Sequence, residues 1–307
     1  MQQPVESKKS NAGLSMCCNR EQFRLRKFGL EHKQPKDFVT LQVGRPVHYL
    51  VWTSFWTAFH LIWCAYDAYY FNATWDVHPA SWLVFLTNWS YTLITVHSFI
   101  DFITACYIFF YKSGTTEEEM PWYMKVNWVI FNLMNTSAIL LTLTYWILLA
   151  KSLAATSINK HGINALYVIL CVSLTAKPIK FQHFYQPAIY NLVYIIFNSV
   201  YTLISGDAVY AFLDWGERPV PALVLSLMYV FVCCPVIHLL LYGLYRLRLR
   251  IARSCTRASK QPPLPHEAEV EMGMLKKTEE ADIDPSDQVI LSNGHHKAIF
   301  ISAKGDV

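Results

Sequence analysis

The chain has 307 residues, of which 53% are hydrophobic and only 16% are charged, with a formal net charge of +4. Soluble domains carry about 25% charged residues, and their apolar residues recur at helical or strand period rather than in long uncharged runs. The composition therefore excludes an ordinary soluble domain and predicts an integral membrane protein with polar tails. The positive charge does not indicate nucleic acid, because the lysines and arginines cluster beside the apolar runs, where topology and anionic lipid explain them.

Residues 1–45 are polar and basic and contain no apolar core, which predicts a cytoplasmic N-terminal tail without a cleavable signal peptide. Residues 46–245 contain six apolar runs and predict a transmembrane domain. The predicted spans cover about residues 46–71, 82–111, 122–150, 161–176, 184–206 and 219–245.

The fourth run is short, since its uncharged part, residues 162–176, covers only about 22 Å of a hydrocarbon core about 30 Å thick. A re-entrant segment is the alternative to a crossing. An arginine cluster follows the sixth run and belongs on the cytoplasmic side, so an even number of crossings fits a cytoplasmic N-terminus. The expected fold class is an all-α membrane protein, a bundle of six transmembrane helices with disordered cytoplasmic tails.

Residues 246–307 form the predicted C-terminal cytoplasmic tail, whose composition cannot bury enough apolar surface to fold alone. Within it, residues 288–304 alternate in polarity on either side of Ser292-Asn293-Gly294. This pattern is typical of a β-hairpin, and plain disorder is the alternative.

The second run carries a polar stripe. At 100° per residue, Thr87, Tyr91, Ser98 and Asp101 fall on one face of a helix, with His97 beside them. Such groups are costly against lipid and usually face the interior of a bundle or a water-filled cavity. We therefore expect this helix to be central.

Asp101 lies near the cytoplasmic end of that helix. Its expected partners are His97, four residues earlier, or Lys177 and Lys180 on a cytoplasmic loop, in a structural polar cluster. The alternative is a proton or ion path, which would make the protein a proton-linked carrier. The polar positions singled out for binding or clustering are Tyr91, His97, Asp101, His183 and Asp214.

His183, together with Lys180, is a candidate for binding lipid phosphate at the cytoplasmic face, although a role in topology explains both residues equally. Asp214, followed by Trp215, is expected to cap and anchor helix ends at the outer interface. The histidines lie on separate segments without metal-ligand spacing, and no glycine-rich phosphate loop occurs. We therefore expect no metal and no cofactor.

Two modification sites are predicted. Asn72-Ala73-Thr74 is an N-glycosylation sequon that fits an outer loop, close to the membrane. Cys17 and Cys18 lie in the basic N-terminal tail and are candidates for palmitoylation, with free cytosolic thiols as the alternative.

Four segments together resemble the rolling stone family of multi-pass membrane proteins over most of residues 20–245. They are FRLRKFGLEHKQPKDFVTLQ, FLTNWSYTL, KPIKFQHFYQPAIYNLVYIIFNSVY and VYAFLDWGERP. The resemblance implies a six-helix integral membrane protein of a family whose namesake is linked to myoblast fusion, and it does not by itself imply a reaction. We expect a non-enzymatic role in membrane organisation or cell–cell fusion, in the plasma membrane or a secretory-pathway membrane. The expected partner is the lipid bilayer, with a lipid ligand also considered and the oligomeric state left open.

A more distant resemblance is to the androgen-induced intramembrane hydrolases, which cleave fatty-acid esters of hydroxy fatty acids with a threonine and a histidine. It would place the nucleophile at Thr87 in FLTNW and align KHGIN with the family's histidine segment. The family's catalytic histidine then falls on Asn164, which cannot act as a general base, so His161 would have to replace it.

Thr87 and His161 are expected at the same outer depth, which supports a lipid-ester hydrolase as the alternative function. For Thr87 the competing interpretation is a hydroxyl bonded to the carbonyl one turn earlier. For His161 it is an ordinary interfacial histidine.

Overall fold

The computed structural model describes residues 28–75, 78–112, 119–149 and 154–258. In these residues the chain is helical and contains no strand, only an isolated antiparallel bridge between Leu41 and Thr175. The helices form one compact unit up to Arg253, and the second unit begins at Ser254. Cys17, Cys18 and the predicted hairpin at 288–304 lie outside the described residues.

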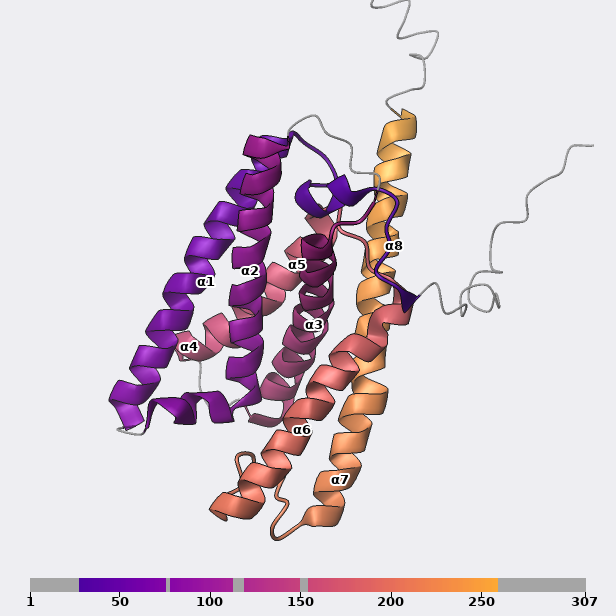
Figure 1. Cartoon of the computed structure of the whole chain (residues 1–307). Coiled ribbons are helices and arrows are strands. Elements are labelled where there is room, and N and C mark those ends of the chain that lie inside the picture. The colour runs from indigo at the N-terminus through magenta and orange to yellow at the C-terminus, as the bar shows by residue number, and fades with distance from the viewer. Residues whose placement is uncertain (1–27, 76–77, 113–118, 150–153, 259–307) are drawn as a thin grey trace, which may run out of the picture. The chain divides into compact units, whose positions relative to one another are not determined.

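Within the described ranges, the helices follow one another as six continuous segments, whose arrangement Figure 1 shows. They are α1 (Pro46–Trp75); α2 (Leu86–Tyr111); α3 (Trp122–Thr144) with η5 (Tyr145–Leu149); α4 (Ala155–Ser157), η6 (Ile158–Ile163) and α5 (Asn164–Leu174); η7 (Phe181–Phe184) with α6 (Tyr185–Ser205); and α7 (Pro219–Met228), η8 (Tyr229–Cys233) and α8 (Cys234–Ala258). Short 3-10 turns precede α1 and α2, namely η3 (Pro35–Val39) and η4 (Pro79–Val84). The segments η5, η6 and η8 are π-helical turns.

Among the described residues, four segments are long and apolar enough to cross a bilayer: Leu86–Tyr111, Trp122–Leu149, Phe181–Ser205 and Pro219–Cys255. They correspond to the second, third, fifth and sixth predicted spans, and they support an integral membrane protein. Six transmembrane helices are not confirmed, because α1 and the α4–α5 segment are not among the helices that qualify. Helix α1 has 30 residues, so its length suffices, but its many tryptophan and tyrosine side chains and one aspartate lower its hydropathy.

The helices do not end at the same residues as the predicted spans. Helix α1 continues through Asn72 to Trp75, and α2 begins at Leu86 because residues 79–84 form a 3-10 turn that the His78 side chain caps. The fourth segment begins at Ala155, ahead of the predicted position 161.

The predicted disordered tail also begins too early, since α8 runs on through residues 246–258. Leucine and arginine both favour helix, and Arg246 donates a hydrogen bond to the Tyr242 hydroxyl at 2.9 Å, one turn earlier. These interactions extend the helix beyond the apolar run that predicted it.

The α7–α8 segment changes its winding where a proline requires it. Pro235 has no N–H to donate, and its ring would clash with the carbonyl four residues earlier in a regular α-helix. The π-helical turn η8 ends at Cys233, two residues before this proline, and accommodates the change. The α7–α8 segment therefore continues as one helix past the proline.

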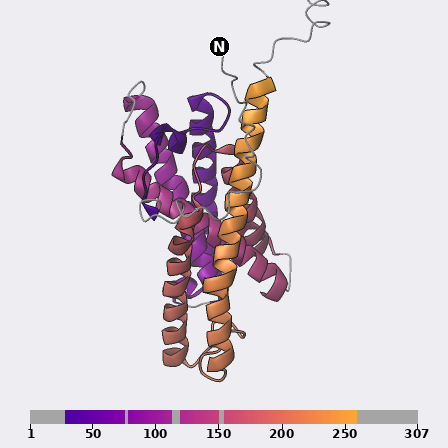
Figure 2. The same cartoon turned by 90° about the vertical axis from the view of Figure 1, so that its right-hand side faces the viewer.

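Helix α2 packs against α1 on one side and α3 on the other, and α3 also contacts α5 and α6. Helix α6 runs beside the α7–α8 segment in both views (Figures 1 and 2). We call the end of the bundle that holds residues 28–45 and Arg248 the terminal end. The opposite end, with η4 and the connection 206–218, is the distal end.

The terminal end is held together by polar contacts between distant segments. The Arg248 guanidinium, only 6% exposed, donates to the carbonyls of Val172 at 2.7 Å, Lys177 at 3.0 Å and Thr175. Val172 lies in the last turn of α5, and Thr175 and Lys177 follow it. The end of a helix leaves acceptors unsatisfied and carries partial negative charge. Arg248 therefore ties α8 to the end of α5.

The N-terminal segment is bound at the same end. The Lys180 ammonium donates to the carbonyls of Gly29 at 2.8 Å and Glu31 at 2.9 Å. Residues 40–42 run antiparallel to residues 174–176, with backbone hydrogen bonds of 2.7 and 2.9 Å. Residues far apart in the chain thus close one end of the bundle.

Candidate functional site

The polar stripe of α2 faces the interior. Tyr91, Ser98 and Asp101 are 0%, 2% and 3% exposed, and His97 is 1% exposed. Thr87, in the first turn, is partly buried. Since α2 lies between α1 and α3, the stripe contacts polar groups from several other segments.

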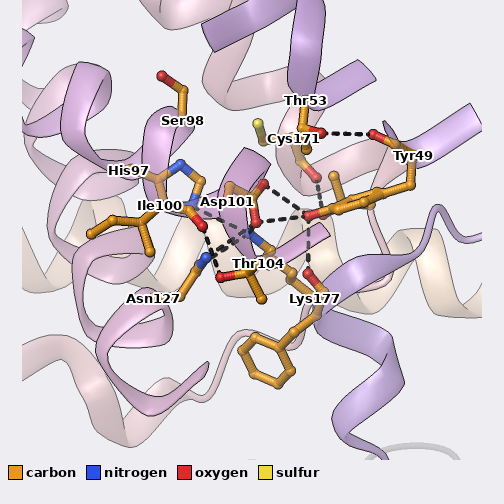
Figure 3. A network of polar contacts seen from close by, with 12 residues as sticks. Tyr49, Thr53, His97, Ser98, Ile100, Asp101, Thr104, Asn127, Cys171 and Lys177 are labelled. Atoms are coloured by element: carbon orange, nitrogen blue, oxygen red, sulfur yellow. Dashed lines mark hydrogen bonds and ion pairs between the residues drawn. The ribbon is translucent and has the colours of Figure 1, made fainter. Parts of the chain in front are cut away.

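Asp101 forms the centre of a buried cluster (Figure 3). Its Oδ1 atom pairs with the Lys177 ammonium at 2.6 Å and accepts a hydrogen bond from the Asn127 amide at 3.1 Å. The Tyr49 hydroxyl lies 2.8 Å from Oδ2 and 3.0 Å from the Phe38 carbonyl. One carboxylate therefore joins α1, α2, α3 and the loop after α5.

Lys177 is equally well enclosed, with 1% of its surface exposed. Besides Asp101, its ammonium group lies 3.1 Å from the Asn127 side-chain oxygen and 3.3 Å from Nε2 of His97. A buried ion pair is tolerated when further hydrogen bonds satisfy the remaining donors and acceptors, as they do here.

The structure thus brings Asp101 to Lys177, one of the partners that the sequence suggested. His97 contacts the lysine rather than Asp101. Lys180 bonds to the N-terminal segment instead, as described above.

A second buried ion pair lies at the distal end. Asp67 of α1 is 3% exposed, and its Oδ2 atom lies 3.0 Å from the Lys160 ammonium and 2.8 Å from the indole nitrogen of Trp82. Lys160 also donates to the Asn88 side-chain oxygen at 3.2 Å. This pair was not predicted from the sequence. Asp67 interrupts one apolar run and Lys160 borders another at the same predicted face, a signal that places both residues at one depth without pairing them.

Polar side chains also occupy the region between the two ion pairs. Asn159 donates to the Tyr91 hydroxyl at 2.7 Å, and the Tyr167 hydroxyl lies 3.5 Å from Nδ1 of His97. His60 is fully buried between them, with its ring centre 6.2 Å from that of Tyr91 and 4.7 Å from that of Tyr167. Polar groups of α1, α2 and α5 therefore extend from one end of the bundle to the other.

The proposed hydrolase residues Thr87 and His161 belong to segments that meet through other side chains. Segment 159–164 meets α2 through Asn88 and Tyr91, as described above. The described contacts do not join Thr87 to His161: the His161 ring stacks on Tyr145 at 3.9 Å between ring centres, with the planes 4° apart.

Asn164, the position that aligns with the catalytic histidine of the hydrolases, bonds within its own helix. Asn164 donates its side-chain amide to the Lys160 carbonyl one turn earlier, at 3.1 Å. This hydrogen bond belongs to the helix itself and does not orient a histidine.

Thr87 lines a cavity of about 460 Å³ at the distal end, formed by α2, the end of α3, α6, and the α7–α8 segment. Tyr145 lines the same cavity, so the ring that stacks on His161 is also part of the cavity wall. The connection 206–218 covers one side: the Tyr210 hydroxyl accepts a hydrogen bond from the Leu86 amide at 3.1 Å and lies beside Thr87. Burial raises the pKa of the Tyr210 phenol, which keeps it uncharged.

His183 is buried rather than open to a phosphate. Its Nδ1 atom lies 3.0 Å from the Asn132 amide, its Nε2 atom 3.4 Å from the Gly29 carbonyl, and its ring packs edge-on against Trp128. Both ring nitrogens thus face protein groups, and Lys180 faces the N-terminal segment. A phosphate site at this position would require these contacts to open.

Asp214 and Asn72 lie at the distal end. The Asp214 carboxylate accepts hydrogen bonds from the amides of Gly216 at 3.0 Å and Glu217 at 2.9 Å, so it stabilises the turn before α7. Asn72 lies in the last turn of α1 and not on an open loop. Glycosylation at Asn72 stays a prediction.

Within the described part of the chain, no group of three or more histidine, cysteine, aspartate or glutamate side chains has the arrangement of a metal site.

Comparison with known proteins gives a consistent result. The family model described as protein rolling stone matches residues 18–262. The chain is 23% identical over 226 residues to protein rolling stone of Drosophila melanogaster, which covers 67% of this chain and 80% of that protein. No solved structure matches.

Proposed function

We propose, from the premise that the chain belongs to the rolling stone family, that it acts without catalysis in membrane organisation or cell–cell fusion. The observation that supports the proposal is that the buried charged side chains pair with one another inside the bundle. Asp101 pairs with Lys177 and Asp67 with Lys160, each inside the bundle, while many large apolar side chains of the same helices face outward. The polar groups serve cohesion of the bundle, and the outer surface suits lipid.

The proposed topology has six crossings with both termini in the cytoplasm. The basic side chains after α7, Arg246, Arg248, Arg250 and Arg253, lie on the last helix at the terminal end, the side that positive charge favours for the cytoplasm. Helix α1 and the α4–α5 segment supply the two additional crossings, since each packs beside a qualifying helix. Protease protection of epitope tags at both termini in sealed cells tests this arrangement, and digestion of either tag from outside contradicts it.

The functional test is a content-mixing assay between two cell populations, each expressing the chain and one half of a split luciferase. Fusion should rise above that of cells without the chain, and it should persist in Thr87→Ala and His161→Ala variants at matched surface levels. No signal above the background at normal surface expression overturns the fusion role. Loss of fusion in Thr87→Ala alone would instead favour catalysis.

The second candidate is an intramembrane lipid-ester hydrolase using Thr87 and His161. It is favoured by the position of Thr87 in the wall of a cavity whose Tyr145 stacks on His161. Purified protein would then hydrolyse a fatty-acid ester of a hydroxy fatty acid, and Thr87→Ala would abolish the reaction. Turnover no higher than that of the variant removes this candidate.

The third candidate, a proton-linked carrier, is favoured by His60, which lies buried between the rings of Tyr91 and Tyr167, on the way from one ion pair to the other. In reconstituted vesicles, a pH gradient would then drive a flux of protons and substrate across the membrane, and Asp101→Asn would reduce this flux. A flux that Asp101→Asn leaves unchanged contradicts the carrier.

A further inference from the structure

We propose that the distal cavity binds one neutral lipid, with its chain along the apolar walls and an uncharged hydroxyl or ester group at Ser226 and Tyr229. This inference adds a ligand to the proposed function. It rests on the proposed function in one respect only, that the chain lies in a bilayer.

The size and position of the cavity suit a lipid. Its volume of about 460 Å³ falls within the range of about 300–1,000 Å³ that small-molecule sites occupy. Its walls come from four helical segments, and Tyr210, Phe212 and Leu213 of the connection 206–218 complete them. It is therefore a defined site within the bundle and not a groove along a single helix.

The lining selects against charge. Among the described residues that form the wall, all are aliphatic, aromatic, sulfur-containing or hydroxyl-bearing, and none is ionised. A carboxylate, phosphate or ammonium group would have to lose its water there without an opposite charge to replace it. An uncharged ester or hydroxyl needs only one or two hydrogen bonds.

The hydroxyl groups needed for those bonds are present. Ser226 is 4% exposed and lines the cavity, and its oxygen has no hydrogen-bond partner among the described groups. A buried hydroxyl without a partner is unfavourable, so a ligand oxygen at this position stabilises the site. Tyr229 follows three residues later, on the same face of the helix, and also lines the cavity.

The neighbours of Tyr229 leave its hydroxyl available to a ligand. It lies beside Thr144, whose own hydroxyl donates to the Leu140 carbonyl at 2.9 Å. Thr144 can therefore accept from Tyr229 while the tyrosine oxygen accepts from a ligand hydroxyl.

The backbone around the cavity is irregular in two places. The π-helical turns η5 and η8 both contribute to the wall, the first through Tyr145 and Leu148 and the second through Tyr229 and Cys233. Single π-turns are rare in helices and frequently mark functional sites. The presence of two π-turns in the wall of one cavity is an observation separate from the polarity of the residues that line it.

The test is photolabelling of the full chain in phosphatidylcholine nanodiscs. The probe is a monoacylglycerol with a diazirine and an alkyne on its acyl chain, and the comparison probe is the free fatty acid with the same chain. Labelled peptides are identified by mass spectrometry. The monoacylglycerol should label the cavity segments 140–149 and 225–237, and the fatty acid should label them several-fold less.

Three variants on α7 give the matched comparison. Ser226→Phe places a ring inside the cavity, in the way of the ligand, and should remove this labelling. Val224→Phe adds the same ring two residues away, at a position that is 53% exposed and outside the cavity, and should not remove it. Ser226→Ala keeps the volume and should weaken monoacylglycerol binding about fivefold, as expected for one lost hydrogen bond of about 1 kcal/mol.

Each contrary result overturns a stated part of the inference. Equal labelling by the fatty acid refutes the proposal that the cavity selects a neutral lipid. Equal loss of labelling in Val224→Phe shows that the probe binds only at the outer surface of the bundle and not in the cavity. Unchanged affinity in Ser226→Ala refutes the assigned polar contact, a result that stands even if Ser226→Phe fails to fold. Because binding is measured on purified protein, failure of the fusion assay leaves this result intact and affects only the proposed function.

Discussion

Replacing Lys177 by methionine is the most direct test of the buried cluster at the terminal end. Methionine has a similar length and removes only the ammonium group, which pairs with Asp101 at 2.6 Å and is otherwise enclosed by Asn127 and His97. The carboxylate of Asp101 would remain buried with no cation beside it. Removing one partner of such a pair costs about 3–5 kcal/mol of unfolding free energy.

The remaining contacts of Asp101 place the expected value at the low end of that range. The carboxylate keeps hydrogen bonds from the Tyr49 hydroxyl at 2.8 Å and the Asn127 amide at 3.1 Å. We therefore expect Lys177→Met to lower the unfolding free energy by about 3 kcal/mol. The double variant Asp101→Asn/Lys177→Met removes both charges and should be less destabilised than either single variant.

The assay is reversible unfolding of the purified protein in mixed micelles with increasing sodium dodecyl sulfate, followed by tryptophan fluorescence. Lys125→Met is the matched control, since Lys125 pairs with Glu31 at 2.5 Å in an exposed position and should contribute less than about 1 kcal/mol. Equal small effects of Lys177→Met and Lys125→Met would refute the argument. So would a double variant whose destabilisation equals the sum of the two single variants.

Three further variants test other contacts in the same unfolding assay. Arg248→Gln leaves the carbonyls at the end of α5 without their charged donor and should cost about 2–3 kcal/mol, so a cost below about 1 kcal/mol would contradict the helix-end contact. Trp82→Phe removes the 2.8 Å hydrogen bond to the buried Asp67 carboxylate and should cost about 2 kcal/mol, whereas Trp122→Phe, at a 75% exposed side chain, should be neutral. Gly206→Ala should cost about 1–2 kcal/mol because Gly206 ends α6 with a φ of +77°, and an unchanged stability would show that the turn adjusts without strain.

The burial of the α2 stripe was predictable because it depends on helical geometry and on the large free-energy cost of exposing polar side chains to lipid. Helical period decides which side chains share a face, and the cost of polar groups against lipid decides that this face turns inward. Asp101 and Lys177 could be matched for the same reason, since each is a charge at the edge of an apolar run on the same predicted side. Four of the six expected spans follow from length and hydropathy alone.

Other features depend on how helices rotate and pack, which sequence periodicity does not determine. The pairing of Asp67 with Lys160 needs a particular face of α1 turned toward the start of the fourth segment. The contact of Arg248 with the end of α5 joins residues more than 70 positions apart, and an arginine cluster by itself indicates only topology. The π-helical turn at Tyr145 precedes no proline, so the sequence carried no signal for it.

Segment 159–164 shows what a hydrolase role would require of the observed contacts. Asn159 bonds to Tyr91, Lys160 to Asp67, and Asn164 to the Lys160 carbonyl, so three of its six residues already hold the fourth helical segment together or attach it to α1 and α2. A hydrolase would need His161 to leave its stack on Tyr145 and approach Thr87. Since the helix that carries His161 is fixed on both sides of it by these bonds, such a movement would have to come from the side chain and from Tyr145 together. The arrangement of this segment therefore favours a binding cavity with a structural wall over a catalytic pair.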